Sequence, residues 1–374
     1  MLIEVEMEAA CPAFGGSNHE EIGHAAADHG SGESYLRLRD PRTSPTPDSA
    51  TQGCSVRAVN GASRDHFVPT DEIDAQIARF PSWHYEFDLR GHRAPKDGLG
   101  ANRNRQEQRA RYVFEPLRRA FGGSLSGKRV LDLGCNAGYF ALGAVSLGCD
   151  FVLGLDARQF HVEQANFVFA AKEIERSRYR FKAQDVDDID IGSEGPFEIV
   201  LCLGLLYHVS DPAGLVERIA RINPQVLVVD TTLLPLPGSV LQLRREQPDD
   251  PRFAAREQFV AIPTRRAVES IAEAAGYSVA ALAPRFSDYQ AAEDYRAGRR
   301  RAFFCTKEPR LLESVEEHVE DTSAARTAWT SARWGLHLAG EALRARTPRR
   351  PGLTGQPGTE ARSRSSISPT SWRP

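Results

Sequence analysis

The stretch VLDLGCNAGYFAL, residues 130–142, decides the fold because its character changes twice along its length. It begins as an apolar strand, presents Asp132 near the end of that strand, and turns through Gly134 and Gly138 into an apolar helix. The first glycine lets the chain turn without a side-chain clash, and the second lets the helix pack closely with its N-terminus toward a ligand. A carboxylate at this point suits a cationic ligand, whereas a pyrophosphate needs bare backbone N–H groups.

The composition indicates a folded core with polar appendages. The chain has 374 residues, of which 41% are hydrophobic, and this length predicts a core domain of about 200–250 residues. The formal net charge of −3 gives no global basic field for nucleic acid. The six cysteines lack C-x-x-C or metal-ligand spacing, so we expect reduced thiols and no metal site. The start of the chain lacks a signal-peptide pattern and no long apolar run occurs, which predicts a cytoplasmic protein without membrane contact.

Composition also divides the chain into segments. Residues 1–70 are rich in small and polar residues and are predicted to be disordered, and whether they belong to the native protein stays open. Residues 71–122 are predicted to form an N-terminal cap or substrate lid, and residues 123–310 the main domain. A C-terminal helix is expected at 311–346, followed by a disordered basic tail at 347–374.

Strand and helix patterns alternate along the main domain, which predicts a parallel sheet with right-handed crossovers. Strands are expected at 129–133, 151–156, 180–185, 198–203 and 225–230, with helices at 139–147, 161–174 and 212–222. An irregular stretch at 233–253 is followed by a helix that ends before Gly276, and then by a closing pair of strands at 277–284 and 300–307. The basic run Arg299–Arg301 is interpreted as a charged device that keeps an edge strand soluble.

Two further acidic residues follow strands. Asp156 lies 24 positions after Asp132, a spacing typical of a carboxylate that holds ribose hydroxyls, although it could also cap the next helix. Asp185 follows the third strand, where it could accept a hydrogen bond from an adenine amine while Val186 packs on the ring. A solvated acidic loop is the alternative interpretation of this third position.

Polar and aromatic residues mark the acceptor side. Tyr207 and His208 follow the fourth strand, at the sheet edge where ligands bind in such folds. His208 is the candidate general base because it titrates near neutral pH, and Tyr207 could orient the acceptor; alternatively the histidine only holds a loop. Trp83 and Tyr85 precede the main domain and could fold over an acceptor, or simply pack against the sheet.

The order of these elements resembles the class I S-adenosylmethionine-dependent methyltransferases over roughly Lys128 to Lys307. The resemblance implies an α/β, Rossmann-like, seven-stranded sheet that is mostly parallel with an antiparallel last strand. It also implies S-adenosyl-L-methionine as cofactor. Cofactor contacts carried over from the family fall on the residues of its motifs, which are Asp132, Gly134, Gly138, Asp156, Ala157, Asp185, Val186 and Leu203.

A narrower resemblance rests on GLLYHVSDPAGLV at residues 204–216 and on WHYEFDL at residues 83–89. Together with FVAIPTRRAVESIAEAAGY at residues 259–277, these strings are similar to the branch that contains the bacterial tRNA wobble-uridine carboxymethyltransferase, in which the tyrosine that matches Tyr207 binds a carboxylated donor. The tryptophan and lysine that precede the first motif in that branch have no clear counterpart here, although Arg111 could substitute as a charge. The chain looks more like the small-molecule tailoring enzymes with the same strings.

The sequence therefore predicts a methyltransferase that acts on oxygen or nitrogen of a small metabolite. Modification of the tRNA wobble uridine, with tRNA as partner, is the first alternative. A cofactor-binding protein without catalysis is the second alternative. Neither the acceptor nor the oligomeric state follows from these patterns.

Overall fold

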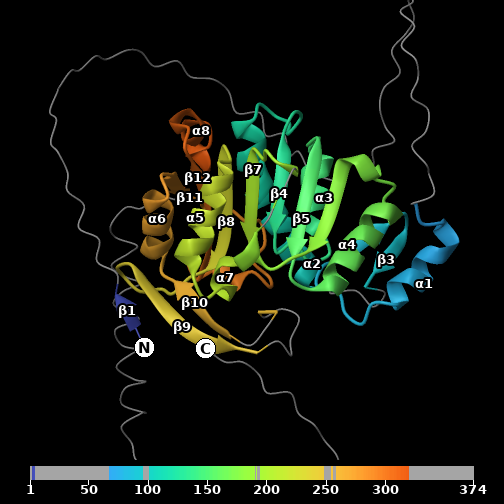
Figure 1. Cartoon of the computed structure of the whole chain (residues 1–374), viewed down its shortest axis with the longest axis horizontal. Coiled ribbons are helices and arrows are strands. Elements are labelled where there is room, and N and C mark those ends of the chain that lie inside the picture. Colours follow the sequence, from blue (N-terminus) through green and yellow to red (C-terminus); the bar gives the residue numbers. More distant parts are fainter. Residues whose placement is uncertain are drawn as a thin grey trace, which may run out of the picture. The chain divides into compact units, whose positions relative to one another are not determined.

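The computed structural model describes residues 2–4, 67–95, 101–189, 191, 194–247, 254–255 and 258–319 (Figure 1). Backbone contacts divide the chain into two units, 1–331 and 332–374, and the second lies wholly outside the described residues. Most of the predicted disordered segment 1–70, most of the predicted helix 311–346 and all of the predicted tail 347–374 also lie outside them. These three segment assignments stay predictions.

A seven-stranded sheet with the order β11-β12-β8-β7-β4-β5-β6 forms the centre of the described structure. The strands β4 to β8 pair in parallel, whereas β12 runs antiparallel to both of its neighbours. The predicted sheet, mostly parallel with an antiparallel last strand, is confirmed. Its strands are β4 (Arg129–Leu133), β5 (Phe151–Asp156), β6 (Tyr179–Ala183), β7 (Ile199–Leu203), β8 (Val226–Thr232), β11 (Ser278–Ala281) and β12 (Arg300–Thr306).

Helices cover both faces of the sheet, as Figure 1 shows. Alternate residues of the central strands belong to two separate hydrophobic clusters, one on each face. The first cluster packs under α2 (Ala101–Ala120), α3 (Tyr139–Ser146) and α4 (Gln159–Ala171), and the second under α5 (Pro212–Ile222) and α6 (Arg265–Ala274). Because both faces are buried, the central strands read as continuous apolar runs rather than as alternating patterns.

Capping residues in the sequence mark where the helices begin and end. Asp211 caps α5 by accepting a hydrogen bond from the Gly214 N–H at 2.9 Å, and Pro212 occupies the first helical position. Gly276 follows α6 with a positive φ of 87°. Two short helices complete the C-terminal part, α7 (Glu293–Arg296) and α8 (Pro309–Glu313).

The predicted N-terminal cap of helix and strand is also present. It consists of α1 (Ile73–Ala78), β2 (Phe87–Leu89) and β3 (His92–Ala94), whose buried side chains join the cluster under α4. Within the segment WHYEFDL at 83–89 only Phe87–Leu89 forms a strand, because β2 pairs with β3.

An antiparallel ribbon occupies the region after β8. It contains β9 (Val240–Glu246) and β10 (Gln258–Pro263), and β1 (Leu2–Glu4) pairs with the outer side of β9. The prediction of irregular structure across 233–253 is wrong for β9. This strand is half-buried along most of its length, so its sequence carries no clear alternation, and pairing with β10 determines its conformation.

A glycine turn joins β4 to α3. Gly134 and Gly138 have φ angles of 67° and 79°, in the left-handed region that other residues rarely adopt. A Cβ atom on Gly138 would lie 3.2 Å from both Phe169 and Phe181, so the N-terminus of α3 approaches the neighbouring elements too closely for a side chain. Both sequence-based roles of these glycines are consistent with this geometry.

We expect Gly138→Ala to destabilise the fold by more than Gly276→Ala. Both variants force alanine into left-handed backbone, which costs about 1–2 kcal/mol. A Cβ on Gly276 meets nothing within 4 Å, whereas a Cβ on Gly138 crowds two phenylalanine rings. Urea unfolding of the two variants measures the difference, and equal losses would contradict the close packing at the turn.

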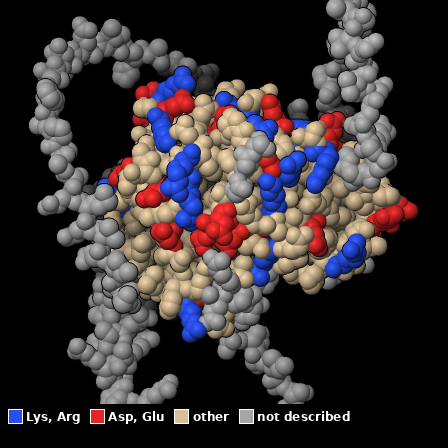
Figure 2. Space-filling model, in the orientation of Figure 1, with Lys and Arg blue, Asp and Glu red and all other residues tan. Residues whose placement is uncertain are grey.

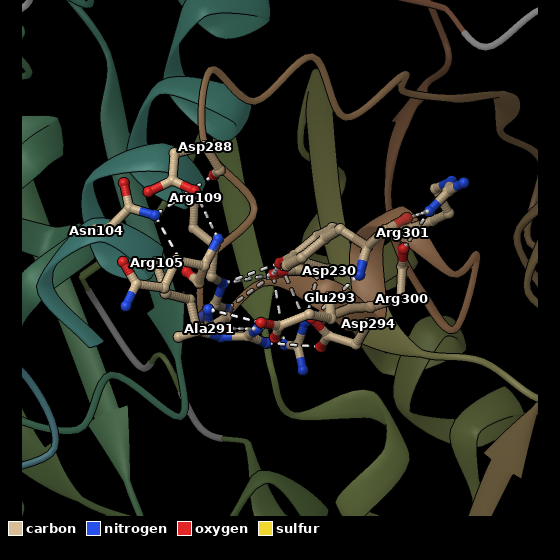
Figure 3. Close-up of polar contacts among 12 residues, drawn as sticks. Asn104, Arg105, Arg109, Asp230, Asp288, Ala291, Glu293, Asp294, Arg300 and Arg301 are labelled. Atoms are coloured by element: carbon tan, nitrogen blue, oxygen red, sulfur yellow. Dashed lines mark hydrogen bonds and ion pairs between the residues drawn. The ribbon is translucent and has the colours of Figure 1, made fainter. Parts of the chain in front are cut away.

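A buried ion cluster joins elements that are far apart in the sequence (Figure 3). Asp230 of β8 accepts hydrogen bonds from Arg109 of α2 at 2.7 Å, from the Tyr295 hydroxyl of α7 at 2.7 Å and from Arg300 of β12 at 3.0 Å. All four residues are at most 5% exposed. Burial alone would raise the pKa of the Asp230 carboxyl, but Arg300 and Arg109 hold it at about 2.

Asp230→Asn leaves two guanidinium groups buried without a carboxylate, and we expect a loss of about 3–5 kcal/mol in the free energy of unfolding at pH 7. The matched control is Asp294→Asn, which removes the partner of Arg105 in a half-buried pair and should cost about 0–1 kcal/mol. Because the pKa of Asp230 is depressed, its contribution is complete above about pH 4 and is lost as the pH falls toward 2. Denaturant titrations at several pH values test both effects; equal losses for the two variants would contradict the account.

Candidate functional site

The candidate site lies at the carboxyl ends of the parallel strands. The strand order reverses at β4, which has β5 on one side and β7 on the other. Ligands of open α/β sheets bind where the order reverses in this way, because the connections from the two neighbouring strands diverge there. The predicted residues Asp132, Asp156, Asp185 and Leu203 all lie at or near this edge.

Asp132 is a buried carboxyl group without a full set of partners. Its side chain belongs to β4 and is 2% exposed, and Oδ2 accepts no hydrogen bond from the residues that the structure describes. Burial raises the pKa of this carboxyl to about 8, the Ala141 backbone opposes that rise through a hydrogen bond, and Asp156 adds to it. A cationic ligand group at this oxygen would remove the cost of burying the ionised form.

Asp156 is held in place by its surroundings. Its Oδ1 accepts from the Arg158 N–H at 2.9 Å and from His161 Nδ1 at 3.0 Å, and its Oδ2 accepts from the Asn136 N–H at 2.9 Å. A carboxylate offers about four lone-pair sites, so one acceptor position is left for a further donor such as a hydroxyl. Ala157 follows on the exposed side of the turn.

Sequence reasoning missed the residues that orient Asp156. His161 is 4% exposed and bridges the Asp156 carboxylate to the side-chain amide of Asn136, whose Nδ2 lies 3.2 Å from His161 Nε2. Asp156 ends β5 and His161 lies in the first turn of α4, so no helical i,i+3 or i,i+4 pattern links the two in the sequence.

Asp185, the third acidic residue, forms part of a local turn. Asp185 follows β6 and accepts a hydrogen bond from the Asp187 N–H at 3.0 Å, while Val186 is 7% exposed. Leu203 closes β7 and is also 7% exposed. The predicted contacts of these residues with adenine and with the far side of the cofactor stay predictions.

The ion cluster borders the same edge next to β7. Gly204 follows β7 with a φ of 86°, and a Cβ atom on it would lie 3.2 Å from Arg300 Nη2. Tyr207 accepts a hydrogen bond from Arg300 Nη1 at 3.4 Å. Two guanidinium groups face one carboxylate, Asp230, so this border carries a net positive charge.

The structure corrects one interpretation of the sequence. The run Arg299–Arg301 was expected on an edge strand as a device for solubility, yet β12 lies between β8 and β11 and Arg300 is 4% exposed. The pairing of Arg109 with Asp230 could not be predicted from local patterns, because the two residues are separated by 121 positions along the chain.

Tyr85 and Trp83 lie in different environments. Tyr85 is 7% exposed and stacks on Tyr139 with ring centroids 5.0 Å apart. Burial raises the pKa of Tyr85, and a hydrogen bond to Arg109 opposes the rise, so its hydroxyl lies beside the ion cluster. Trp83 packs among Phe80, Phe87 and Phe167, which matches the alternative of packing; contact of either residue with an acceptor stays a prediction.

The Nδ1 atom of His208 has a hydrogen-bond partner. Its Nδ1 lies 2.7 Å from Oε2 of Glu246, the last residue of β9, and its ring lies against Tyr207 with centroids 4.0 Å apart. Gln258 of β10 donates to the backbone carbonyl of His208 at 2.8 Å. Glu246 was missed because it falls in the stretch that was expected to be irregular.

Within the described residues, no group of three or more His, Cys, Asp and Glu side chains could hold a metal ion. No helix in the same part of the chain is long and apolar enough to cross a bilayer.

Part of the chain is similar to known proteins. Residues 105–282 match the family model described as a methyltransferase domain. A ubiquinone biosynthesis O-methyltransferase of Neisseria meningitidis serogroup A is 32% identical over 120 residues, which cover 32% of this chain and 50% of that protein. A tRNA U34 carboxymethyltransferase of Trichodesmium erythraeum is 26% identical over 159 residues, which cover 41% of this chain and 46% of that protein.

Among solved structures, the N-terminal domain of EvdMO1, crystallised with SAH and D-fucose, is 24% identical with a TM-score of 0.47; the match covers 64% of this chain and 97% of that one. The chain spans about half the length of the curated relatives it matches. Residues 105–282 are therefore similar to a methyltransferase domain, and the central sheet has the strand arrangement that the resemblance to class I S-adenosylmethionine-dependent methyltransferases predicts.

Proposed function

We propose that this protein is an S-adenosylmethionine-dependent methyltransferase that acts on oxygen or nitrogen of a small metabolite. One observation carries the proposal: Asp132 and Asp156 lie at the carboxyl ends of the adjacent parallel strands β4 and β5, each with acceptor capacity left over. A ligand that combines an ammonium group with ribose hydroxyls matches this pair.

The residues present fit the cofactor. The unpartnered Oδ2 of Asp132 suits its ammonium group, and the remaining acceptor position of Asp156 suits a ribose hydroxyl. Gly134 and Gly138 allow close approach of the backbone, and buried Val186 offers an apolar contact for adenine. When bound, the cofactor supplies a methyl group already activated on a sulfonium sulfur.

The chain then has to position an acceptor and manage its proton. Holding the reacting atoms in line can contribute roughly 7–11 kcal/mol to catalysis. A hydroxyl acceptor must also lose a proton, which a positioned base accelerates by about 10²–10⁴. His208 is our candidate for that base, and Tyr207 is our candidate for orienting the acceptor, because both follow β7 at the site edge.

Small-molecule and tRNA acceptors differ in the surface that they require. Binding of tRNA needs an extended basic surface. In Figure 2 acidic and basic side chains are interspersed over the visible face, so the described residues form no extended basic surface on that face. The name of the Neisseria relative also refers to a small-molecule pathway.

A second candidate deserves a test because of the positive border near β7. A carboxylated donor would meet the Tyr207 hydroxyl and the Arg300 guanidinium together, and the relative from Trichodesmium is a tRNA U34 carboxymethyltransferase. Calorimetry that compares S-adenosylmethionine with its carboxylated form distinguishes the two donors. Filter binding to bulk tRNA at low and high salt distinguishes the two acceptors.

Transfer of a tritiated methyl group from S-adenosylmethionine to a panel of phenols, catechols and aryl amines tests the proposed activity. We expect labelled product with at least one of these acceptors. Cofactor binding without transfer to the panel or to tRNA would favour the alternative of a cofactor-binding protein without catalysis.

At pH 7 we expect S-adenosylhomocysteine to bind with release of close to one proton. The pKa of about 8 keeps Asp132 protonated in the free protein, and an ammonium group beside it favours the carboxylate. Asp132→Asn should abolish the release and weaken binding by about 1.5–3 kcal/mol, roughly 10–150-fold. Calorimetry in two buffers of different ionisation enthalpy measures both quantities.

The control is Asp188→Asn, which changes an exposed carboxylate and should leave affinity and proton release unaltered.

The raised pKa of Asp132 also makes the stability of the folded protein depend on pH. The protonated carboxyl contributes its full stability below about pH 4, and this contribution is lost as the pH rises through 8. Asp132→Asn should therefore unfold at a higher temperature than the unliganded parent at pH 8. Absence of any binding to the parent protein would contradict the proposed function.

A further inference from the structure

The ribbon formed by β9 and β10 reaches the candidate site from outside the main sheet. The ribbon is inserted between β8 and α6, and its strands pair with each other from Glu246↔Gln258 to Leu241↔Pro263. Both strands contact the turn that carries Tyr207 and His208. The ribbon therefore contributes side chains to the site, although neither the motifs nor the family match assigned it a role.

The hydrogen bonds of Glu246 define the orientation of the imidazole. Its Oε2 accepts from the Ala254 N–H at 2.9 Å and lies 2.7 Å from His208 Nδ1. A carboxylate can only accept, so the proton of a neutral imidazole resides on Nδ1 and leaves Nε2 as an acceptor. The two side chains are 13% and 16% exposed, so water competes weakly for this bond.

The ribbon also fixes the backbone around the imidazole. Gln258 donates to the His208 carbonyl at 2.8 Å, and the Ala261 N–H donates to the Val209 carbonyl at 2.9 Å. The ring is thus held from β9 through its side chain and from β10 through its main chain. Rigid support of this kind preserves the geometry that proton transfer requires.

We propose that Glu246 is a positioning residue that holds His208 in the Nδ1–H tautomer, so that Nε2 accepts the proton of a hydroxyl acceptor. This inference rests on the proposed function. In the step, the acceptor oxygen forms a bond to the methyl carbon and the carbon–sulfur bond breaks with its electron pair on sulfur. The acceptor proton moves to His208 Nε2, and the Glu246 carboxylate stabilises the resulting imidazolium.

Long-range ¹H–¹⁵N NMR of histidine-labelled protein observes the tautomer directly and needs no acceptor. We expect the His208 signals of the parent protein at high pH to show a protonated Nδ1 and an unprotonated Nε2. In Glu246→Ala the signals should shift toward a mixture of tautomers. An Nε2–H tautomer in the parent, or an unchanged Nδ1–H tautomer in Glu246→Ala, would overturn the inference.

Kinetics with catechol as the hydroxyl probe provide the second readout. Glu246→Gln should lower kcat by roughly 10²-fold, with KM for the methyl donor and affinity for S-adenosylhomocysteine within about twofold of the parent. Glu246→Asp should recover part of the loss because it restores the carboxylate. The control Glu269→Gln alters a glutamate that pairs with Arg265 on α6 and should leave kcat unchanged.

The two readouts separate this inference from the proposed function. If S-adenosylhomocysteine does not bind the parent protein, the proposed function fails. If it binds, and Glu246→Gln transfers methyl groups to catechol at the parent rate, the positioning role of Glu246 fails while the proposed function stands.

Discussion

Burial of the sheet on both faces is the constraint on which the rest of this structure depends. Every residue of β7 is buried, and β4 and β5 are buried except at their first residues. A charge buried in such strands needs partners that offset its desolvation, and Asp132, Asp156 and Asp230 lie toward the carboxyl ends of their strands, where other elements meet the sheet. Because parallel strands place those ends at one edge, the packing of the core also gathers the polar groups of the site.

The site edge separates two kinds of charge. The carboxyl groups of Asp132 and Asp156 lie near β4 and β5, whereas the guanidinium groups of Arg109 and Arg300 outnumber the Asp230 carboxylate near β7 and β8. The cluster is at the same time structural, because it joins α2 and α7 to the sheet, so changes to it affect stability and binding together.

Local patterns were enough to predict the central part of the fold, and long-range pairing explains what they missed. The bounds of β4, β5 and α5 match the expected segments, because each is a strongly apolar or well-capped run. Glu246 escaped prediction because pairing with β10, rather than its own pattern, makes β9 a strand. The prediction that Arg300 lies on an edge strand was wrong because β12 is inserted between β8 and β11, and this pairing buries the residue.

A crystal structure of the complex with S-adenosylhomocysteine tests the central claim most directly. The account predicts the ribose hydroxyls on the Asp156 carboxylate, the ammonium group on Oδ2 of Asp132, and the thioether sulfur directed toward the turn that carries His208. A nucleoside bound away from the carboxyl ends of β4 and β5, or bound there without contact to either aspartate, would contradict it.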